Sequence, residues 1–294
     1  MNVSGKTKVC GLIGDPVEHS LSPCLQNAAF RSLGLDFVYV AFRVEKDRLG
    51  AAIDGMRSLG ILGLNVTMPH KISVVQYLDE LDETAKSVGS VNTIMNKGGK
   101  LVGSTSDGRG ALEALRHGGI EPSAKKVVIL GAGGVSRSIS WTLAEEAREL
   151  VILNRTLGKA EELAEELKTN KAIDTSVKAA ELTNRNAQRE LRNADILINA
   201  TSVGMSPQEE LTPVDPSLLR SDLAVFDLVY DPLETRLLAE AKKTRAKTVD
   251  GLAMLVFQGA ITFETWTGVK APVEVMVKAA RQEISKRAGE RRGQ

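Results

Sequence analysis

The segment LNVTMPHK, residues 64–71, ends an apolar run with a threonine, a histidine and a lysine around a single proline. Its pattern predicts a strand up to Thr67 and a helix after Pro69, so Lys71 would stand at the mouth of a sheet. A lysine that is partly shielded from water can give up a proton there and take it back. We therefore expect proton-transfer chemistry at Lys71, against the alternative of a solvated helix residue.

A carboxylate in the segment GSTSDGRG is the expected partner of this lysine. Asp107 lies where the pattern along the chain changes to regular repeats of strand and helix, which we interpret as a boundary between two domains. A lysine and an aspartate that face each other exchange protons as one unit. The alternative role for Asp107 is that of a helix N-cap.

The three histidines of the chain are weaker candidates for acid and base. His117 precedes two glycines at the expected end of a helix, which is typical of a cap. His19 and His70 have no evident orienting partner in the sequence, so we assign both a structural role.

Hydroxyl and amide side chains provide further polar contacts. Ser20 and Ser22 follow the first strand, Asn92 and Thr93 follow Gly89, and Gln258 stands inside an apolar helix. Burying an unpaired amide costs about 1–3 kcal/mol, so Gln258 needs a partner. A helix cap is the alternative for one of the two serines, but not for both.

A glycine cluster follows a strand and precedes a helix in KKVVILGAGGVSRS, residues 125–138. Unpaired N–H groups at a helix N-terminus bind phosphate, and glycines let the phosphate approach the backbone. Ser136 occupies the position of the third glycine of the dinucleotide-binding pattern, and its small side chain still permits close packing. The alternative is a tight turn that binds nothing. The residues expected at the phosphates are Gly131, Ala132, Gly133, Gly134 and Val135.

The next strand, ELVILNRT, ends without the acidic residue that binds an NAD ribose. Asn154 is followed by Arg155, which can bind a 2′-phosphate, and by Thr156, which adds a hydroxyl. Lys159 adds positive charge one turn later. We therefore predict NADP(H) rather than NAD(H), against the alternative that Arg155 is a solvated residue at the end of a strand.

The segment NATSVGM, residues 199–205, ends a later strand at the sheet edge where ligands gather in such folds. Its alternative is an ordinary turn between strand and helix. A nicotinamide enzyme that oxidises an alcohol takes hydride from carbon while the hydroxyl proton leaves. Lys71 with Asp107 would accept that proton, and in the reverse direction the lysine would return it to the nascent alkoxide.

The elements that would carry these residues form an α/β protein of two domains. Strands are expected at 8–14, 37–44, 63–67, 91–95 and 100–104, with a hairpin turn at 96–99, which gives one sheet of mixed direction. The later strands at 126–130, 149–154, 195–200, 224–229 and 247–250 alternate with helices, as in a parallel Rossmann-type sheet.

The bulk composition favours a small-molecule partner. The 294 residues carry a net charge of +1 without a basic stripe, so we expect no nucleic-acid or membrane partner. Cys10 and Cys24 are interpreted as buried apolar residues of a cytoplasmic protein. The N-terminus lacks the apolar stretch of a signal peptide, the run at 252–263 is too short to span a bilayer, and we expect no metal site.

The chain resembles the shikimate dehydrogenase family over nearly its whole length. The resemblance is carried by SLSP (20–23), NVTMPHK (65–71), GSVNT (89–93), GAGGVSR (131–137), NRT (154–156), NATSVGM (199–205), DLVYDPLETRLL (227–238) and DGLAMLVFQGA (250–260). It implies an NADP-dependent oxidoreductase that interconverts 3-dehydroshikimate and shikimate in the biosynthesis of chorismate and the aromatic amino acids.

The resemblance also implies roles for individual residues. Lys71 and Asp107 match the catalytic pair. The substrate-binding groups are Ser20, Ser22, Thr67, Asn92, Tyr230 and Gln258. The cofactor site gains Thr201, Val203, Met205 and Gly251. The implied substrate domain is discontinuous, 1–107 plus 251–294, around an NADP-binding domain at 108–250, in a monomer or homodimer.

Two departures from the family pattern are expected to matter. The family writes G-x-N-T-D before the boundary, whereas this chain has Thr105 and Ser106 before Asp107, which affects the local backbone. Lys159 stands where a second arginine is common. Action on quinate or on both acids, with NAD as a possible cofactor, is the first alternative. A non-catalytic dinucleotide-binding sensor is the second, although binding alone requires neither Lys71 nor Asp107.

Overall fold

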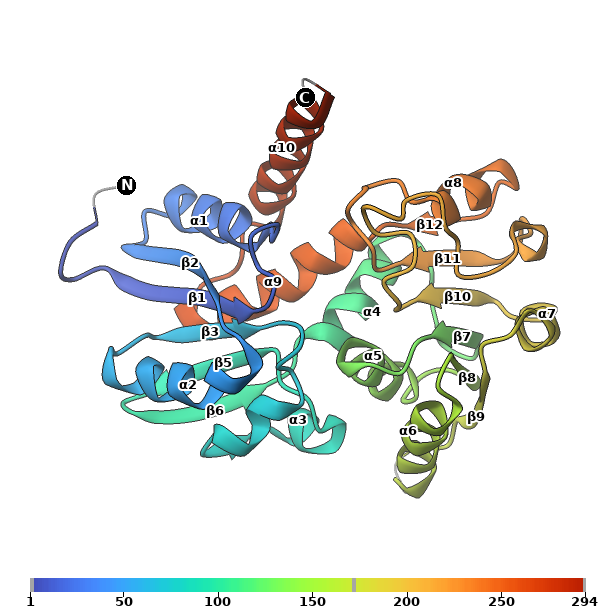
Figure 1. Ribbon diagram of the computed structural model, residues 1–294, viewed down its shortest axis with the longest axis horizontal. Helices are drawn as coiled ribbons and strands as arrows, with labels where there is room; N and C mark the ends of the chain where they lie inside the picture. Colours follow the sequence, from blue (N-terminus) through green and yellow to red (C-terminus); the bar gives the residue numbers. More distant parts are fainter. Residues whose placement is uncertain (1–2, 171–172, 293–294) are drawn as a thin grey trace. The chain divides into compact units, whose positions relative to one another are not determined.

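The computed structural model describes residues 3–170 and 173–292. The chain divides into two compact units (Figure 1). The first unit comprises Met1–Ser106 with Leu255–Gln294, and the second comprises Asp107–Met254. The sequence places the corresponding boundaries after residues 107 and 250.

A six-stranded sheet of mixed direction organises the first unit. Its strands are β1 (Lys8–Gly14), β2 (Phe37–Arg43), β3 (Gly63–Val66), β4 (Glu80–Leu81), β5 (Thr93–Lys97) and β6 (Lys100–Ser104). They lie in the order β2-β1-β3-β5-β6-β4. The β3–β5 and β5–β6 pairs are antiparallel and the other pairs are parallel, so the sheet has the predicted mixed direction.

The helical segments of this unit are α1 (Ser22–Ser32), η1 (Lys46–Arg48), α2 (Leu49–Ser58), η2 (Ser73–Tyr77), α3 (Glu83–Val88), α10 (Val273–Arg292) and, from Leu255 onward, α9 (Gly251–Thr267). Ile53 of α2 packs with Leu64 in a core on one face of the sheet. Successive residues of a strand point to opposite faces of the sheet, so a second layer is needed on the other face. There the indole N–H of Trp266 in α9 donates to the Ile94 carbonyl at 3.1 Å. Phe263 of α9 stacks on Phe30 of α1, which completes the second layer.

The second unit is a parallel sheet of six strands with helices between them. Its elements are α4 (Asp107–His117), β7 (Lys126–Leu130), α5 (Gly134–Leu143), β8 (Glu149–Asn154), α6 (Leu157–Thr169), β9 (Ser176–Glu181), α7 (Asn184–Leu191), β10 (Ile196–Asn199), η3 (Pro216–Leu218), β11 (Ala224–Asp227), α8 (Arg236–Lys243) and β12 (Thr248–Val249). The strand order is β12-β11-β10-β7-β8-β9. This is the Rossmann order, whose direction of winding reverses between β7 and β10.

The main error in the predicted elements concerns the segment after Pro69. We expected a helix that carries Lys71, but Lys71 lies in a turn, and only the short 3-10 helix η2 follows it from Ser73. The strands β4 and β9 and the helix α3 were not predicted. β9 is the edge strand of its sheet and only Val177 in it is fully buried, so it carries no apolar run that reveals it.

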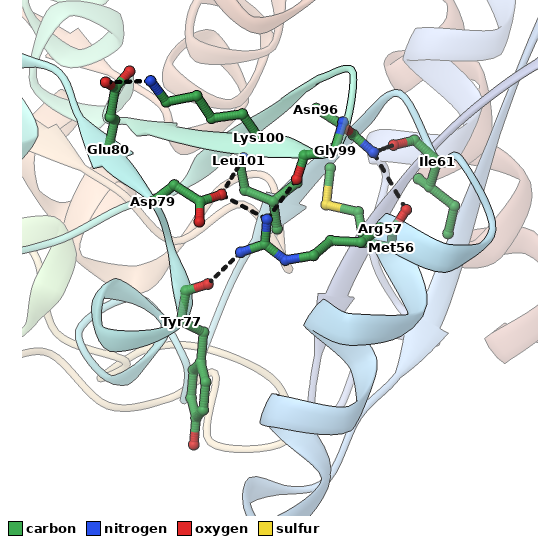
Figure 2. A network of polar contacts seen from close by, with 10 residues as sticks. All are labelled: Met56, Arg57, Ile61, Tyr77, Asp79, Glu80, Asn96, Gly99, Lys100 and Leu101. Atoms are coloured by element: carbon green, nitrogen blue, oxygen red, sulfur yellow. Dashed lines mark hydrogen bonds and ion pairs between the residues drawn. The ribbon is translucent and has the colours of Figure 1, made fainter.

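A polar network fastens η2 and β4 to the rest of the first unit (Figure 2). The Arg57 guanidinium pairs with Asp79 at 2.6 Å and donates to the Gly99 carbonyl at 2.5 Å and the Tyr77 carbonyl at 3.1 Å. The same Asp79 oxygen accepts the Leu101 N–H at 2.6 Å. The chain that continues from Lys71 is thereby fixed between α2 and the hairpin of β5 and β6.

No helix in the described part of the chain combines the length and apolar character needed to cross a bilayer.

Candidate active site

Four loops of the first unit converge because of the strand directions. β1, β3 and β6 end at the edge where the antiparallel β5 begins, since Asn65 pairs with Thr93 and Thr93 pairs with Ser104. The loops that carry Ser20, Lys71, Asn92 and the residues before Asp107 all leave the sheet at this edge. The sequence could identify these polar segments, but the strand register brings them together.

The Lys71 loop is held by backbone bonds on both sides. Thr67 donates its N–H to the Ile13 carbonyl at 2.9 Å, and the His70 N–H bonds the Thr67 carbonyl at 2.9 Å to close a turn. The Lys71 carbonyl accepts the Val91 N–H at 2.8 Å. The half-buried Lys71 is therefore tied to the residue that immediately precedes Asn92.

His70 fastens this loop to Val44, the residue that follows β2. Its ring is 1% exposed, and Nε2 lies 2.7 Å from the Val44 carbonyl oxygen. A carbonyl can only accept a hydrogen bond, so this nitrogen carries the proton. The structural role assigned to His70 from the sequence agrees with this contact. His19 is exposed, and its carbonyl accepts a bond from Arg287.

The two serines after β1 have different surroundings. Ser20 accepts the Ser22 N–H through its hydroxyl at 3.2 Å, so Ser20 rather than Ser22 supports the start of α1. Ser22 is buried, and its side chain bonds that of Tyr39. The Tyr39 hydroxyl donates to Asn65 Oδ1 at 2.8 Å. Burial raises the pKa of Tyr39 above its ordinary value, so the phenol stays protonated and a donor.

Asn92 is the centre of a buried polar cluster in the first unit. Its Oδ1 accepts the Ser106 N–H at 2.9 Å and the Thr93 hydroxyl at 2.9 Å. Its Nδ2 donates to the Ser106 hydroxyl at 2.9 Å and, at the longer distance of 3.4 Å, to Gln258 Oε1. Gln258 has the polar partner that its place in an apolar helix requires, because its Nε2 also donates to the Leu255 carbonyl at 2.9 Å.

Asp107 opens α4 and is 3% exposed. The residue before it, Ser106, is held by Asn92 through its N–H, and the residue after it, Gly108, donates its N–H to the Ser138 hydroxyl at 3.0 Å. The Thr105 and Ser106 that depart from the family pattern are both buried. The backbone of Ser106 is bonded within the first unit.

The glycine turn of the second unit has little room for side chains. Gly131 has φ +108, and a Cβ there would lie 2.9 Å from the Ala200 carbonyl oxygen. Its N–H bonds the Leu153 carbonyl at 2.8 Å, and its carbonyl accepts the Ser136 hydroxyl at 2.5 Å. The serine at the third glycine position thus closes the turn. α5 begins at Gly134, so the N–H groups of its first turn are available to a phosphate.

A cluster of cationic and hydroxyl side chains follows β8. Arg155, Thr156 and Lys159 are exposed, and the turn is held by the Asn154 Nδ2 bond to the Thr156 carbonyl at 2.8 Å. Neither Arg155 nor Lys159 has an ion-pair partner among the residues that the structure describes. Two unpaired cations at the end of the second strand of a Rossmann sheet fit a 2′-phosphate.

The turn after β10 is organised by the buried Asn199. Its Oδ1 accepts the N–H of Thr201 at 3.1 Å and the Thr201 hydroxyl at 2.6 Å, and its Nδ2 donates to the Val203 carbonyl at 3.2 Å. Met205 is 41% exposed at the end of this turn. The segment lies beside β7, where winding reverses and dinucleotides bind in this fold.

Asp227, the last residue of β11, joins this turn to two further segments. It is fully buried and accepts hydrogen bonds from Asn199, Val229 and Thr235. Burial raises its pKa to about 6, although the three hydrogen bonds oppose that shift. The half-buried Tyr230 follows three residues later.

Gly251 begins α9 and lies against the same region. A Cβ at this position would collide with the carbonyl groups of Leu228 and Val229, so a side chain does not fit. Asp250 accepts the Ala253 N–H at 3.0 Å and caps the helix. Gly251 therefore allows α9 to start close to the backbone that precedes Tyr230.

Several residues of these clusters were not identified from the sequence. They are Tyr39, Asn199, Asp227, Thr235 and Thr262. Thr262 lies one turn after Gln258 on α9, and its hydroxyl is 3.0 Å from the Thr93 hydroxyl. The sequence does carry a signal for Asp227. It is the acidic residue that ends the apolar run before LVYDP, and a side chain within such a run is shielded from solvent.

Three family models match the chain. The model for the shikimate dehydrogenase substrate binding domain matches residues 12–94, and that for shikimate/quinate 5-dehydrogenase matches residues 114–229. The model for the shikimate 5′-dehydrogenase C-terminal domain matches residues 251–281.

Relatives and solved structures agree with these matches. Shikimate dehydrogenase (NADP(+)) of Methanopyrus kandleri is 50% identical, with 97% of this chain and 98% of the relative covered. A crystal structure of shikimate dehydrogenase in complex with NADP+ is 45% identical with a TM-score of 0.89, and covers 96% of this chain and 98% of its own. Shikimate 5-dehydrogenase from Listeria monocytogenes, in complex with shikimate and NAD, is 37% identical with a TM-score of 0.88; the coverage is 95% and 98%.

Proposed function

The chain belongs to the shikimate dehydrogenase family, and we propose on that premise that it catalyses the NADP-dependent, reversible reduction of 3-dehydroshikimate to shikimate. The reaction is a step in the biosynthesis of chorismate and the aromatic amino acids. The observation that carries the proposal is the edge of the first sheet at which the polar loops converge. There the Lys71 carbonyl accepts a hydrogen bond from the Val91 N–H, next to Asn92. The fold of the second unit supplies the matching Rossmann-type cofactor domain.

Lys71 and Asp107 are the proposed catalytic pair. When bound, NADPH would supply the hydride that reduces the carbonyl carbon of 3-dehydroshikimate, which would leave an alkoxide to be protonated. Lys71 gives its ammonium proton to that alkoxide, and in the oxidative direction it takes the proton back. Asp107 orients the ammonium group and shares the proton with it. The support is the place of Lys71 at the polar sheet edge and the anchoring of both neighbours of Asp107.

The acid substrate is proposed to lie at the polar edge of the first unit. Its carboxylate would bind the hydroxyl of Ser20 and, in place of the Ser22 bond to Tyr39, the hydroxyl of Ser22, so that each carboxylate oxygen accepts one hydrogen bond. The Asn92 contact with Gln258 is long, so a ring hydroxyl of the substrate can replace it. The full proposed set of substrate-binding residues is Ser20, Ser22, Thr67, Asn92, Tyr230 and Gln258.

The cofactor is proposed to bind along the carboxyl edge of the second sheet. The adenosine 2′-phosphate would bind Arg155, Thr156 and Lys159, which explains the use of NADP(H). The pyrophosphate would bind the glycine turn. The full set of proposed cofactor-binding residues is Gly131, Ala132, Gly133, Gly134, Val135, Asn154, Arg155, Thr156, Lys159, Thr201, Val203, Met205 and Gly251.

Residues 1–107 with 251–294 form the proposed substrate and catalytic domain, and residues 108–250 form the proposed NADP-binding domain. We also infer a cytoplasmic monomer or homodimer. Cys10 and Cys24 are not paired with each other, and burial raises their pKa values to about 12 and about 11, so neither supplies a thiolate at neutral pH. Cys24 is only half-buried, rather than fully buried as the sequence suggests. Light scattering of the purified protein distinguishes the two assembly states.

The experiment that tests the activity is the initial rate of nicotinamide absorbance change. Shikimate and quinate are each combined with NADP and with NAD. Activity mainly with shikimate and NADP is expected. Activity mainly with quinate would contradict the proposed substrate, and equal activity with NAD would contradict the role of the cations after β8.

A further inference from the structure

Asp227 is a buried carboxylate that the proposed reaction does not use directly. Its side chain is 0% exposed, as are those of Asn199 and Thr235. Its Oδ1 accepts Asn199 Nδ2 at 2.9 Å and the Val229 N–H at 3.1 Å, and its Oδ2 accepts the Thr235 hydroxyl at 2.6 Å. One carboxylate therefore joins three separate segments of the second unit.

Each of these segments leads to a residue of the proposed site or to the start of a helix. Asn199 bonds Thr201 and Val203, so it transmits the position of Asp227 to the turn of residues 200–205. Val229 immediately precedes Tyr230. Thr235 caps α8 by accepting the Leu238 N–H at 3.3 Å.

We propose that Asp227 is a positioning residue that fixes the cofactor turn after β10 and the backbone before Tyr230. The inference rests on the proposed function, because it assumes that residues 200–205 contact NADP(H). Asp227 acts through Asn199 and through the Val229 N–H.

The chemistry of the side chain supports this role. All three partners donate, and only a carboxylate offers acceptors on both of its oxygens. An asparagine could accept from Asn199 and Val229, but its NH2 group would face the Thr235 hydroxyl and force that hydroxyl to turn away. Burial raises the pKa of Asp227 to about 6, so ionisation at neutral pH opposes folding. Pure stability would favour an uncharged residue here.

The first test compares Asp227→Asn with Glu190→Gln. Glu190 is a second buried carboxylate of the same unit, 3.0 Å from Lys126 Nζ at the start of β7. The dissociation constant for NADPH is measured by fluorescence, and hydrogen exchange is measured for the amides of residues 200–205 in the free protein. Urea unfolding of each variant reports its stability.

We expect Asp227→Asn to raise the NADPH dissociation constant about 10-fold or more and to speed exchange of the 200–205 amides, since hydrogen bonds to a charge are lost. Its urea midpoint should stay near that of the unaltered protein. Glu190→Gln should lower the urea midpoint and leave NADPH binding unchanged. Unchanged NADPH binding or unchanged exchange in Asp227→Asn overturns the inference.

A second pair of variants covers the case in which Asp227→Asn does not fold. Thr235→Val removes one donor to Asp227, whereas Thr235→Ser keeps the hydroxyl. NADPH binding should weaken in the valine variant and be retained in the serine variant, and equal binding by both contradicts the inference. NADPH binding needs no acid substrate, so these results are independent of turnover. Absence of turnover with shikimate in the unaltered protein counts against the proposed function.

Discussion

The Asn92 side chain holds the Ser106 backbone, with 2.9 Å between Oδ1 and the Ser106 nitrogen, directly before Asp107. The residue expected to bind substrate therefore also fixes the approach to the proposed catalytic carboxylate. Its amide reaches Gln258 as well, so one buried side chain connects two of the loops with α9.

This relationship predicts different effects for two neighbouring substitutions. Asn92→Ala should lower kcat about 10²-fold, because the backbone before Asp107 loses its anchor. Ser106→Ala keeps the N–H bond to Asn92 and loses only a hydroxyl, so its kcat should fall less than about 5-fold. Steady-state rates of the two variants provide the comparison, and similar losses in both would contradict a backbone role for Asn92.

Lys71→Ala should lower kcat by about 10²–10⁴ because the proton donor is lost. The dissociation constant for shikimate, measured by calorimetry, should change little. Lys97→Ala is a suitable control because Lys97 is exposed at the end of β5. Wild-type turnover in Lys71→Ala would remove this lysine from the mechanism.

Arg155→Ala should raise KM for NADP(H) far more than KM for NAD(H), about 10-fold or more, because only NADP(H) has the 2′-phosphate. The exposed Arg185 of α7 provides a matched control. KM values for both cofactors are measured with both variants. An equal change for NADP(H) and NAD(H) in Arg155→Ala would exclude a phosphate contact.

Replacement of both Ser20 and Ser22 by alanine should raise KM for shikimate about 10-fold or more, with little change in KM for NADP. Ser20→Ala alone should also destabilise the start of α1, because its hydroxyl accepts the Ser22 N–H. Kinetics and thermal unfolding separate the two effects. A lower melting temperature with an unchanged KM would leave the serines with structural roles only.

Asp79 makes the first unit sensitive to acid. Its hydrogen bond with the Arg57 guanidinium, and then that with the Leu101 N–H, lowers the pKa of Asp79 below its ordinary value of 3.8. The resulting stability is present above the unfolded pKa and is lost as pH falls through the folded pKa. Asp79→Asn should therefore lower the urea midpoint at pH 7, and the difference from the unaltered protein should shrink below about pH 4. A difference that is the same at both pH values would contradict this account.

The sequence predicted the α/β fold class, with one mixed and one parallel Rossmann-type sheet, and most of the strands, because apolar runs and glycine turns are local signals. It could not predict that Lys71 lies in a turn, because a proline such as Pro69 is common both at the start of a helix and in a turn. The cluster of Thr93, Ser106 and Thr262 depends on strand register and on a helix more than 150 residues later. Short polar side chains of this kind become informative only when the sheet places them together.

The order of the units along the chain has a consequence for synthesis. The second unit is inserted between Ser106 and Leu255, and α9 supplies Phe263 and Trp266 to the first unit. A ribosome therefore releases the whole Rossmann sheet before it releases the helix that completes the layer begun by Phe30. Until α9 is synthesised, the apolar face of the N-terminal segment stays uncovered. We therefore expect the inserted unit to finish folding first.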